Sequence, residues 1–191
     1  QARPTLKHPE SGLYALAGPL AQDYLGAMSA AARYAWFNRV VLAEMVRTVL
    51  ASKSCLPRSE LIVDIPHNII LQEEGFNVHR KGSTPSIDGK LAIIPGSMGD
   101  YSYLVHGTSN PKWLNSCTHG AGRKVRRGET HHLKSKETSK LQFECVTLSQ
   151  ERLIEESPLA YKNIGPVIEA QTSQELVRPA LRLRPWLTFK A

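Results

Sequence analysis

An uninterrupted helical run near the start of the chain limits its possible folds more than any other feature. From Gln22 to about Ser52 the sequence is rich in alanine, contains no proline, and has Gly26 as its only glycine, a composition that favours helix. Apolar side chains recur along this run at steps of three, four or seven residues: Tyr24, Met28, Ala31, Ala35, Leu42, Met45 and Val49. The spacing predicts a long helix with one buried face.

The remainder of the chain has the pattern of short strands separated by turns. Runs of apolar or β-branched residues predict strands at 61–65, 76–79, 91–94, 102–105 and 141–148. Residues 113–122 are expected to be mostly loop, with a short helix possible after Gly120. A short helix is expected to begin near Asn163, with Pro166 tolerated in its first turn, and 176–189 is expected to form an extended final strand broken by Pro179 and Pro185. The predicted class is α+β: one long N-terminal helix, then short mixed strands in packed sheets with short helices.

Composition narrows the possible partners. A chain of 191 residues can form one domain of ordinary size, so residues 1–191 are predicted to be a single domain. The chain contains 24 Lys and Arg residues and 17 Asp and Glu residues, which gives a net charge of +7. This positive charge favours a polyanionic partner such as nucleic acid or a nucleotide.

The cysteines and the hydropathy indicate the compartment. The three cysteines lie far apart with no CxxC pair, which indicates neither a zinc ribbon nor a disulfide scaffold and fits a reducing, cytoplasmic location. No apolar run is long enough for a membrane span, so no membrane partner is expected. The chain begins at Gln1 rather than Met, which suggests a processed, trimmed or partial product.

The stretch 116–123, Ser-Cys-Thr-His-Gly-Ala-Gly-Arg, is the strongest candidate for chemistry. Gly120 and Gly122 allow backbone N–H groups to come close to a phosphate, and Arg123 supplies a fork of donors that matches phosphate oxygens. His119 then lies where an imidazole nitrogen could attack phosphorus or bind a metal. A glycine-flanked histidine by itself is a weak signal.

Two further segments place histidines or cations beside strands. His67-Asn68 follows the predicted strand 61–65, so His67 is either a metal ligand or a surface or half-buried histidine with a backbone partner. The segment 79–82, His-Arg-Lys-Gly, brings Arg80 and Lys81 to a turn, where they could hold an RNA phosphate or form a solvated hairpin tip.

A glycine-bounded loop and a basic cluster complete the candidates. The loop at 95–99, Pro-Gly-Ser-Met-Gly, with Ser102 and Tyr103 after it, offers N–H groups and hydroxyls to a purine or phosphate, although such loops are usually only turns. The cluster Arg123, Lys124, Arg126 and Arg127 is suited to a phosphate backbone, or is a solvated charged face. The P-loop string GxxxxGK[ST] does not occur, which argues against that kind of phosphate binding.

Taken in order, these segments resemble the RtcB family of tRNA-splicing RNA ligases. The strings that carry the resemblance are Asp23-Tyr24-Leu25-Gly26-Ala27-Met28, Ala35-Trp36-Phe37-Asn38-Arg39, His67-Asn68, His79-Arg80-Lys81-Gly82, Ile94-Pro95-Gly96-Ser97-Met98-Gly99, Ser102-Tyr103, His119-Gly120-Ala121-Gly122-Arg123, Pro158-Leu159-Ala160-Tyr161-Lys162-Asn163-Ile164 and Phe189-Lys190-Ala191. They span nearly the whole chain. The resemblance implies a ligase that uses GTP and Mn²⁺ to join RNA 3′-phosphate or 2′,3′-cyclic phosphate ends to 5′-hydroxyl ends.

The resemblance also implies a role for individual residues. It makes His119 the nucleophile that holds GMP, His67 a manganese ligand, and Arg80, Lys81 and Arg123 contacts to phosphates or RNA. The residues implied at the guanylate pocket are Asn68, Pro95, Gly96, Ser97, Met98, Ser102, Gly120, Ala121, Gly122, Tyr161 and Lys190.

The sequence departs from the family pattern in two places. The Asp-x-x-Cys, Asn-His-Phe and His-Ser-Gly-Ser-Arg strings that supply most of the family's metal ligands do not occur here, so the chain resembles a C-terminal portion whose partner is the missing N-terminal half. Lys124-Val125-Arg126-Arg127 also replaces the usual Met-Ser-Arg string. The alternatives to a ligase are a non-catalytic RNA-binding module and an inactive truncated fragment.

Overall fold

The computed structural model describes residues 6–7, 14–53, 59–132 and 144–190. The chain divides into two compact units, Gln1–His79 and Arg80–Ala191, which are described separately below. Both helices and strands are present, so the α+β class is confirmed. The single-domain assignment for 1–191 stays a prediction.

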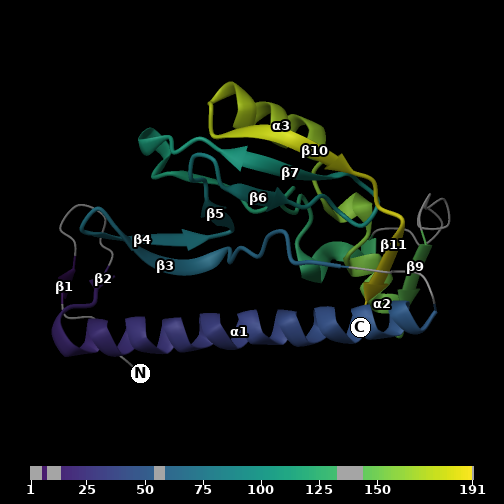
Figure 1. Ribbon diagram of the computed structural model, residues 1–191, viewed down its shortest axis with the longest axis horizontal. Coiled ribbons are helices and arrows are strands. Elements are labelled where there is room, and N and C mark those ends of the chain that lie inside the picture. Colours follow the sequence, from purple (N-terminus) through teal and green to yellow (C-terminus); the bar gives the residue numbers. More distant parts are fainter. Residues whose placement is uncertain (1–5, 8–13, 54–58, 133–143, 191) are drawn as a thin grey trace. The chain divides into compact units, whose positions relative to one another are not determined.

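The first unit is dominated by α1 (Gly18–Ser52), a helix of 35 residues that Figure 1 shows as one unbroken rod. It begins earlier than predicted because Pro19 occupies its first turn, where a proline fits without loss of a helical hydrogen bond. The predicted buried face is not found, since no α1 residue is buried. The partly covered residues of α1 are Leu20, Ala21, Leu25, Met28, Ala32 and Ala35 in its N-terminal half, and Leu50 near its C-terminal end.

The strands of the first unit form small ribbons. β1 (Leu6–Lys7) pairs with β2 (Tyr14–Ala15), and β3 (Asn68–Glu73) is the hydrogen-bonded neighbour of β4 (Phe76–Lys81), which runs into the start of the second unit. Glu74 and Gly75 join β3 to β4, both with positive φ, as a tight two-residue hairpin turn requires. β3 was not predicted from the sequence.

The strand predicted at 61–65 is wrong. This segment has no regular structure, because it has no partner strand among the described residues. It contacts α1 instead: the Asp64 carboxylate accepts hydrogen bonds of 2.6 and 2.8 Å from the Arg39 guanidinium. Consequently His67 directly precedes β3, and Asn68 is the first residue of that strand.

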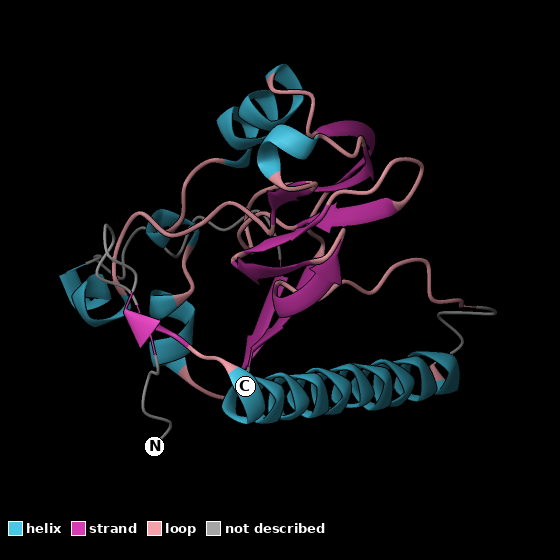
Figure 2. Ribbon diagram, turned by 90° about the vertical axis from the view of Figure 1, so that its left-hand side faces the viewer, coloured by secondary structure: helices cyan, strands magenta, loops and turns pink. Residues whose placement is uncertain are grey.

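The second unit is built on an antiparallel sheet in the order β10–β7–β6. β6 (Leu91–Ile94) has the predicted bounds, β7 (Ser102–Gly107) begins where predicted, and β10 (Val177–Leu183) is an edge strand that accommodates Pro179 at a change of register. The helix expected from Asn163 is α3 (Ile164–Ser173), which packs on β10 (Figure 2). Ile94, Val105, Val177 and Ile164 are each at most 2% exposed and form the centre of the core.

Shorter elements complete this unit. β5 (Ser83–Pro85) pairs antiparallel with β8 (Ser116–Thr118), and β9 (Glu144–Thr147) pairs parallel with β11 (Leu187–Lys190). The other elements are α2 (Gln150–Glu155), which was not predicted, and the 3₁₀ helices η1 (Pro111–Trp113), η2 (Arg127–His132) and η4 (Pro158–Ala160).

Three sequence predictions for this unit are refined by these elements. The expected final strand is two strands, β10 and β11, because Pro185 interrupts it. Of the strand predicted at 141–148, residues 144–147 form β9, and 141–143 lie outside the described residues. Residues 120–126 contain no helix.

None of the helices in the described residues is long and apolar enough to cross a membrane.

Arg80 holds the strand pair next to the candidate site. Its side chain is 3% exposed, and its guanidinium donates to Ser116 Oγ at 2.8 Å and to the carbonyl oxygens of Leu114 and Asn115 at 2.8 and 3.4 Å. Leu114 and Asn115 both have positive φ, an uncommon conformation for residues other than glycine. The buried guanidinium therefore stabilises a costly turn directly before β8.

Replacing Arg80 with alanine is expected to lower the free energy of unfolding by roughly 3 kcal/mol, because three partly buried acceptors lose a charged donor and the removal of the buried side chain leaves a cavity. Urea denaturation of Arg80→Ala and of Lys81→Ala, whose side chain is exposed, measures the effect. Equal stability of the two variants would contradict this role.

Candidate functional site

The turn that carries His119 follows β8 and is held against the loop after β6. The Ala121 N–H donates to the Pro95 carbonyl oxygen at 3.1 Å, and Thr118 Oγ1 donates to the Gly120 carbonyl oxygen at 2.9 Å. A Cβ atom on Gly120 would lie 2.9 Å from the same Pro95 oxygen. Glycine is therefore required here for the close approach of two backbones.

The His119 ring is oriented by the backbone of Gly82. Its Nδ1 atom lies 2.5 Å from the Gly82 carbonyl oxygen. A carbonyl oxygen can only accept, so Nδ1 carries the proton in the neutral imidazole, and the lone pair lies on Nε2. Gly82 itself has a φ of +72°, and a Cβ there would lie 3.3 Å from His119 Cε1. The geometry gives His119 the tautomer that a nucleophile acting through Nε2 needs.

His119 lies at the wall of a cavity of about 450 Å³ in the second unit. The cavity is formed by the loop after β6, the glycine turn after β8, and the segment that joins α2 to α3. Its lining residues are Pro95, Gly96, Ser97, Met98, His119, Gly120, Ala121, Gly122, Arg123, Arg127, Glu156 and Tyr161. Segments far apart in the sequence thus meet at one nucleotide-sized space.

The loop after β6 is tightly fixed on its inner side. The Gly96 N–H donates to Ser102 Oγ at 3.2 Å, and the Ser97 carbonyl oxygen accepts from the Asp100 N–H at 3.0 Å. A Cβ on Gly96 would lie 2.1 Å from the Tyr101 carbonyl oxygen, which leaves no room for any other residue. Ser102 therefore supports the cavity wall without lining the cavity.

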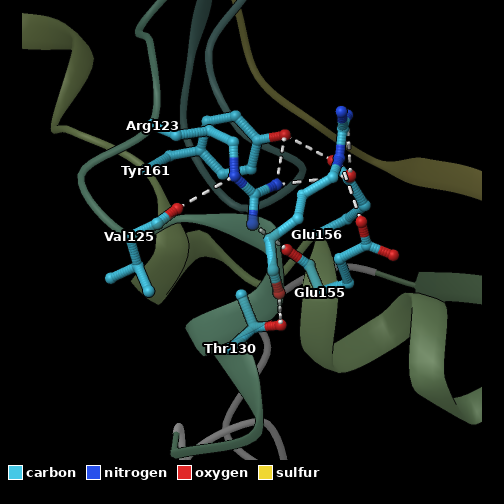
Figure 3. A network of polar contacts seen from close by, with 7 residues as sticks. Arg123, Val125, Thr130, Glu155, Glu156 and Tyr161 are labelled. Carbon is cyan, nitrogen blue, oxygen red and sulfur yellow. Dashed lines mark hydrogen bonds and ion pairs between the residues drawn. The ribbon is translucent and has the colours of Figure 1, made fainter.

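Arg123, Glu156 and Tyr161, which line the cavity, belong to a network of polar side chains (Figure 3). The Arg123 guanidinium donates to Tyr161 Oη at 3.2 Å, to Glu156 Oε1 at 3.3 Å and to the Glu155 carbonyl oxygen at 2.7 Å. It also lies 5.0 Å from the centroid of the Tyr161 ring, and Tyr161 Oη donates a short hydrogen bond to Glu156. This network fixes the tyrosine ring at the cavity.

Arg127 adds a second cation to the same acids. Its Nε atom lies 2.9 Å from Glu155 Oε1, and its Nη2 atom lies 3.6 Å from Glu156 Oε1. Two cations and two carboxylates therefore balance each other in this network. Within the basic cluster, Lys124 and Arg126 are exposed, and neither forms an ion pair among those found in the described residues.

The Tyr161 hydroxyl has a raised pKa. Burial is the largest cause, and the hydrogen bond to Glu156 acts in the same direction, whereas Arg123 opposes it. The folded chain therefore retains this proton at a pH where the unfolded chain, with an ordinary tyrosine pKa near 10, loses it.

The free energy of unfolding is accordingly expected to fall as the pH rises from about 10 toward the raised pKa, and to be unaffected by this group below about pH 9. Tyr161→Phe lacks the titrating hydroxyl, so its stability is expected to fall less steeply in that window. Urea denaturation of both proteins from about pH 9 to about pH 11 checks the difference in slope. Parallel curves would contradict a proton held by the Glu156 contact.

Most of the predicted nucleotide and phosphate residues lie together around the cavity. Nine of the predicted lining residues are present with Arg123: Pro95, Gly96, Ser97, Met98, His119, Gly120, Ala121, Gly122 and Tyr161. The predicted roles of these residues toward GTP or RNA stay predictions.

The other predicted residues are not among the described residues that line this cavity. His67 and Asn68 are exposed residues of the first unit, and Lys81 is exposed on β4. Arg80 is buried behind the turn before β8, an arrangement that gives its predicted phosphate contact no support. Lys190 ends β11, but its side chain lies outside the described residues.

Sequence reasoning missed the two acids of the network. Glu155 and Glu156 come directly before Ser157-Pro158, and no motif marked them. The available signal was their nearness in sequence to Tyr161. Arg127 was read only as part of a basic cluster, whereas in the structure it pairs with these acids.

The described residues do not form a complete metal site. No three His, Cys, Asp or Glu side chains among them come together in a way that could hold a metal ion. The implied manganese therefore does not fit a donor set within the described part of this chain, and His67 is its one predicted ligand here.

Comparison with known proteins matches nearly the whole chain to one family. Residues 2–191 match the sequence profile of "tRNA-splicing ligase RtcB". The chain is 36% identical over 180 residues to RNA-splicing ligase RtcB2 of Escherichia coli, covering 87% of this chain and 45% of that protein. It is 34% identical over 194 residues to RNA-splicing ligase RtcB of Mycobacterium bovis, with 87% and 44% covered. The chain thus spans less than half the length of these relatives.

Proposed function

The chain belongs to the RtcB family of tRNA-splicing ligases, and we propose that it supplies the nucleophile and nucleotide pocket of a GTP- and manganese-dependent RNA ligase. The proposed reaction joins RNA 3′-phosphate or 2′,3′-cyclic phosphate ends to 5′-hydroxyl ends through a GMP-histidine intermediate. RNA and GTP are the proposed substrates, and the cytoplasm is the proposed location.

The observation that supports this proposal most strongly is the position and tautomer of His119. The ring lines the cavity, and the Gly82 carbonyl oxygen holds the proton on Nδ1. A histidine nucleophile attacks phosphorus through an unprotonated ring nitrogen, so a fixed Nδ1–H donor bond prepares Nε2 for the reaction.

From a 3′-phosphate end the proposed chemistry has three steps; a 2′,3′-cyclic phosphate end is first opened by water, which breaks the bond from phosphorus to the 2′-oxygen and leaves a 3′-phosphate. Nε2 of His119 attacks the α-phosphorus of GTP, a P–N bond forms, and the bond to the bridging oxygen breaks so that pyrophosphate leaves. A 3′-phosphate oxygen of the RNA then attacks the same phosphorus and displaces His119. Finally the 5′-hydroxyl attacks the activated 3′-phosphate, a phosphodiester forms, and GMP leaves with the proton of the hydroxyl passing to solvent. Covalent catalysis thereby converts a poor electrophile into a good one.

The cavity residues suit the guanosine part of such an intermediate. The Tyr161 ring offers an apolar surface held by Arg123 and Glu156, and aromatic rings bind nucleobases by stacking. The glycine turn after β8 and the 95–98 loop also line the cavity and allow close approach of their backbones. Arg123 is engaged with protein acceptors, so we propose that it orients the network rather than serving mainly as an RNA contact.

The proposed need for manganese rests on membership of the RtcB family, since the described residues contain no group of three metal-binding side chains. His67 is kept as a proposed ligand, with Asn68 beside the nucleotide. We propose that the remaining ligands come from a polypeptide that corresponds to the part of the RtcB relatives that this chain does not match.

A ligation assay tests the function. The chain, alone and together with the unmatched segment of the Escherichia coli relative, is incubated with GTP, Mn²⁺ and two RNAs that carry a 3′-phosphate and a 5′-hydroxyl. A joined product that requires GTP is expected when both polypeptides are present. Failure to form it, with the RNA ends intact, would contradict the ligase assignment.

The second candidate is a non-catalytic RNA-binding module, favoured by the exposed Lys124 and Arg126. Binding through these cations would weaken steeply with salt and would be indifferent to GTP and Mn²⁺. An inactive fragment would show neither ligation nor such binding.

A further inference from the structure

The helix α1 is apolar around its whole circumference and has no buried residue in the structure. Only five of its 35 residues are charged: Asp23, Arg33, Arg39, Glu44 and Arg47. Its larger apolar side chains are well exposed: Tyr24, Tyr34, Trp36, Phe37, Val40, Val41, Leu42, Met45, Val46 and Val49. They range from 38% exposed at Val40 to 74% at Tyr34.

A helix with this distribution of apolar side chains is expected to be buried against another structure. A helix that lies on the surface of a globular protein has an apolar stripe and a polar face, whereas one that is apolar all round is buried inside a larger protein or a membrane. No helix among the described residues is apolar enough to span a membrane. An exposed apolar surface of this extent on a protein therefore indicates an interface with another polypeptide.

The C-terminal half of α1 and the segment that follows it form an apolar groove of about 750 Å³. Val40, Leu42, Val46, Leu50 and Leu61 line it, and Leu61 is 70% exposed.

Four of the five charged side chains that line the groove pair with one another, and the fifth is the carboxylate of Glu60. Arg39 donates to both oxygens of Asp64, and Arg47 donates to both oxygens of Glu44. Paired charges offer little to a phosphate backbone, and their mutual neutralisation suits an apolar partner.

We propose that this face of α1, with its groove, is the docking surface for the polypeptide that corresponds to the unmatched part of the RtcB relatives. More than half of each relative has no counterpart in this chain, since the chain covers 45% and 44% of the two proteins compared above. The proposed partner presents an apolar protein surface. RNA does not match the groove, because both of its arginines, Arg39 and Arg47, are paired with carboxylates. The proposal concerns assembly and goes beyond the ligase chemistry.

A binding experiment without nucleotide tests this surface separately from the catalytic proposal. The unmatched segment of Escherichia coli RNA-splicing ligase RtcB2 is produced with an affinity tag and mixed with this chain, and the mass of the complex is measured by light scattering during gel filtration. A one-to-one complex is expected. Val46→Asp and Leu61→Asp are each expected to weaken binding about tenfold or more, because each places a charge at the centre of an apolar interface.

The matched control is Leu148→Asp, since Leu148 is 96% exposed and belongs to the second unit. It is expected to bind as the parent chain does, and circular dichroism shows whether the α1 variants keep their helix. Absence of a complex would overturn the proposal, as would equal binding by all the variants. A dimer of the chain alone that Val46→Asp dissociates would assign the surface to a second copy instead, and retention on phosphatidylcholine vesicles would assign it to lipid.

Discussion

Replacing His119 with alanine is expected to abolish guanylylation and to reduce RNA joining by roughly a thousandfold or more, because the residue that forms the covalent bond is lost. The structure gives a specific reason to expect so large an effect. The His119 ring has its proton held on Nδ1 by Gly82 and lies at the wall of the cavity. Gel separation of joined from unjoined RNA measures the loss.

The control for this variant is His106→Ala. His106 is an exposed histidine on β7 of the same unit and does not line the cavity, so its loss should leave the rate unchanged. Circular dichroism establishes that both variants are folded. Joining by His119→Ala at the rate of His106→Ala would mean that another group attacks the phosphorus.

The second large effect is expected at Gly96. Replacing it with alanine would place Cβ 2.1 Å from the Tyr101 carbonyl oxygen and 3.1 Å from the Tyr101 carbonyl carbon. These are backbone atoms that cannot rotate away, so the loop after β6 must move. The expected result is a loss of about 3 kcal/mol in the free energy of unfolding, together with loss of nucleotide binding.

Gly128→Ala provides the matched comparison, since a Cβ there would meet no atom within 4 Å. Urea denaturation and titration with GTP measure both properties in the two variants. Gly96→Ala with both the stability and the GTP binding of Gly128→Ala would contradict the close contact. Normal stability with lost GTP binding would instead mean that the loop moves at little cost but no longer forms the cavity wall.

Local patterns predicted the elements that need little long-range information. The helix over most of α1, the bounds of β6, the start of β7 and the helix after Asn163 all follow from spacing, proline position or a cap. The Asn163 side chain accepts from the Gly165 N–H at 2.8 Å, a contact that the sequence alone makes plausible.

Elements that depend on partners were harder to predict. Residues 61–65 have a strand-like composition, but strand formation also needs a neighbouring strand, and the Arg39 contact with Asp64 holds the segment beside α1. The periodicity of α1 predicted a buried face, but none of the helix residues is buried in the described structure, because burial depends on a packing partner that the spacing of side chains does not specify.

The candidate site shows the same division. Glycine and histidine motifs identified the 95–98 loop and the 119–122 turn, because close backbone approach restricts those positions to few residue types. Glu156 carries no such restriction, since a glutamate is common anywhere on a surface. Glu156 is identified as part of the site by the fold, which brings the side chains of Arg123, Arg127 and Tyr161 into contact with its carboxylate.

The most direct test of the central claim is covalent labelling with α-labelled GTP in the presence of Mn²⁺, followed by denaturing electrophoresis. The parent chain and His119→Ala are compared, each alone and with the unmatched segment of the Escherichia coli relative. An acid-labile label on the parent chain, absent from the variant and located in the peptide that contains His119, is the predicted result. A label that persists in His119→Ala, or no label on the parent chain even with the segment supplied, would contradict the assignment of His119 as the guanylylated nucleophile.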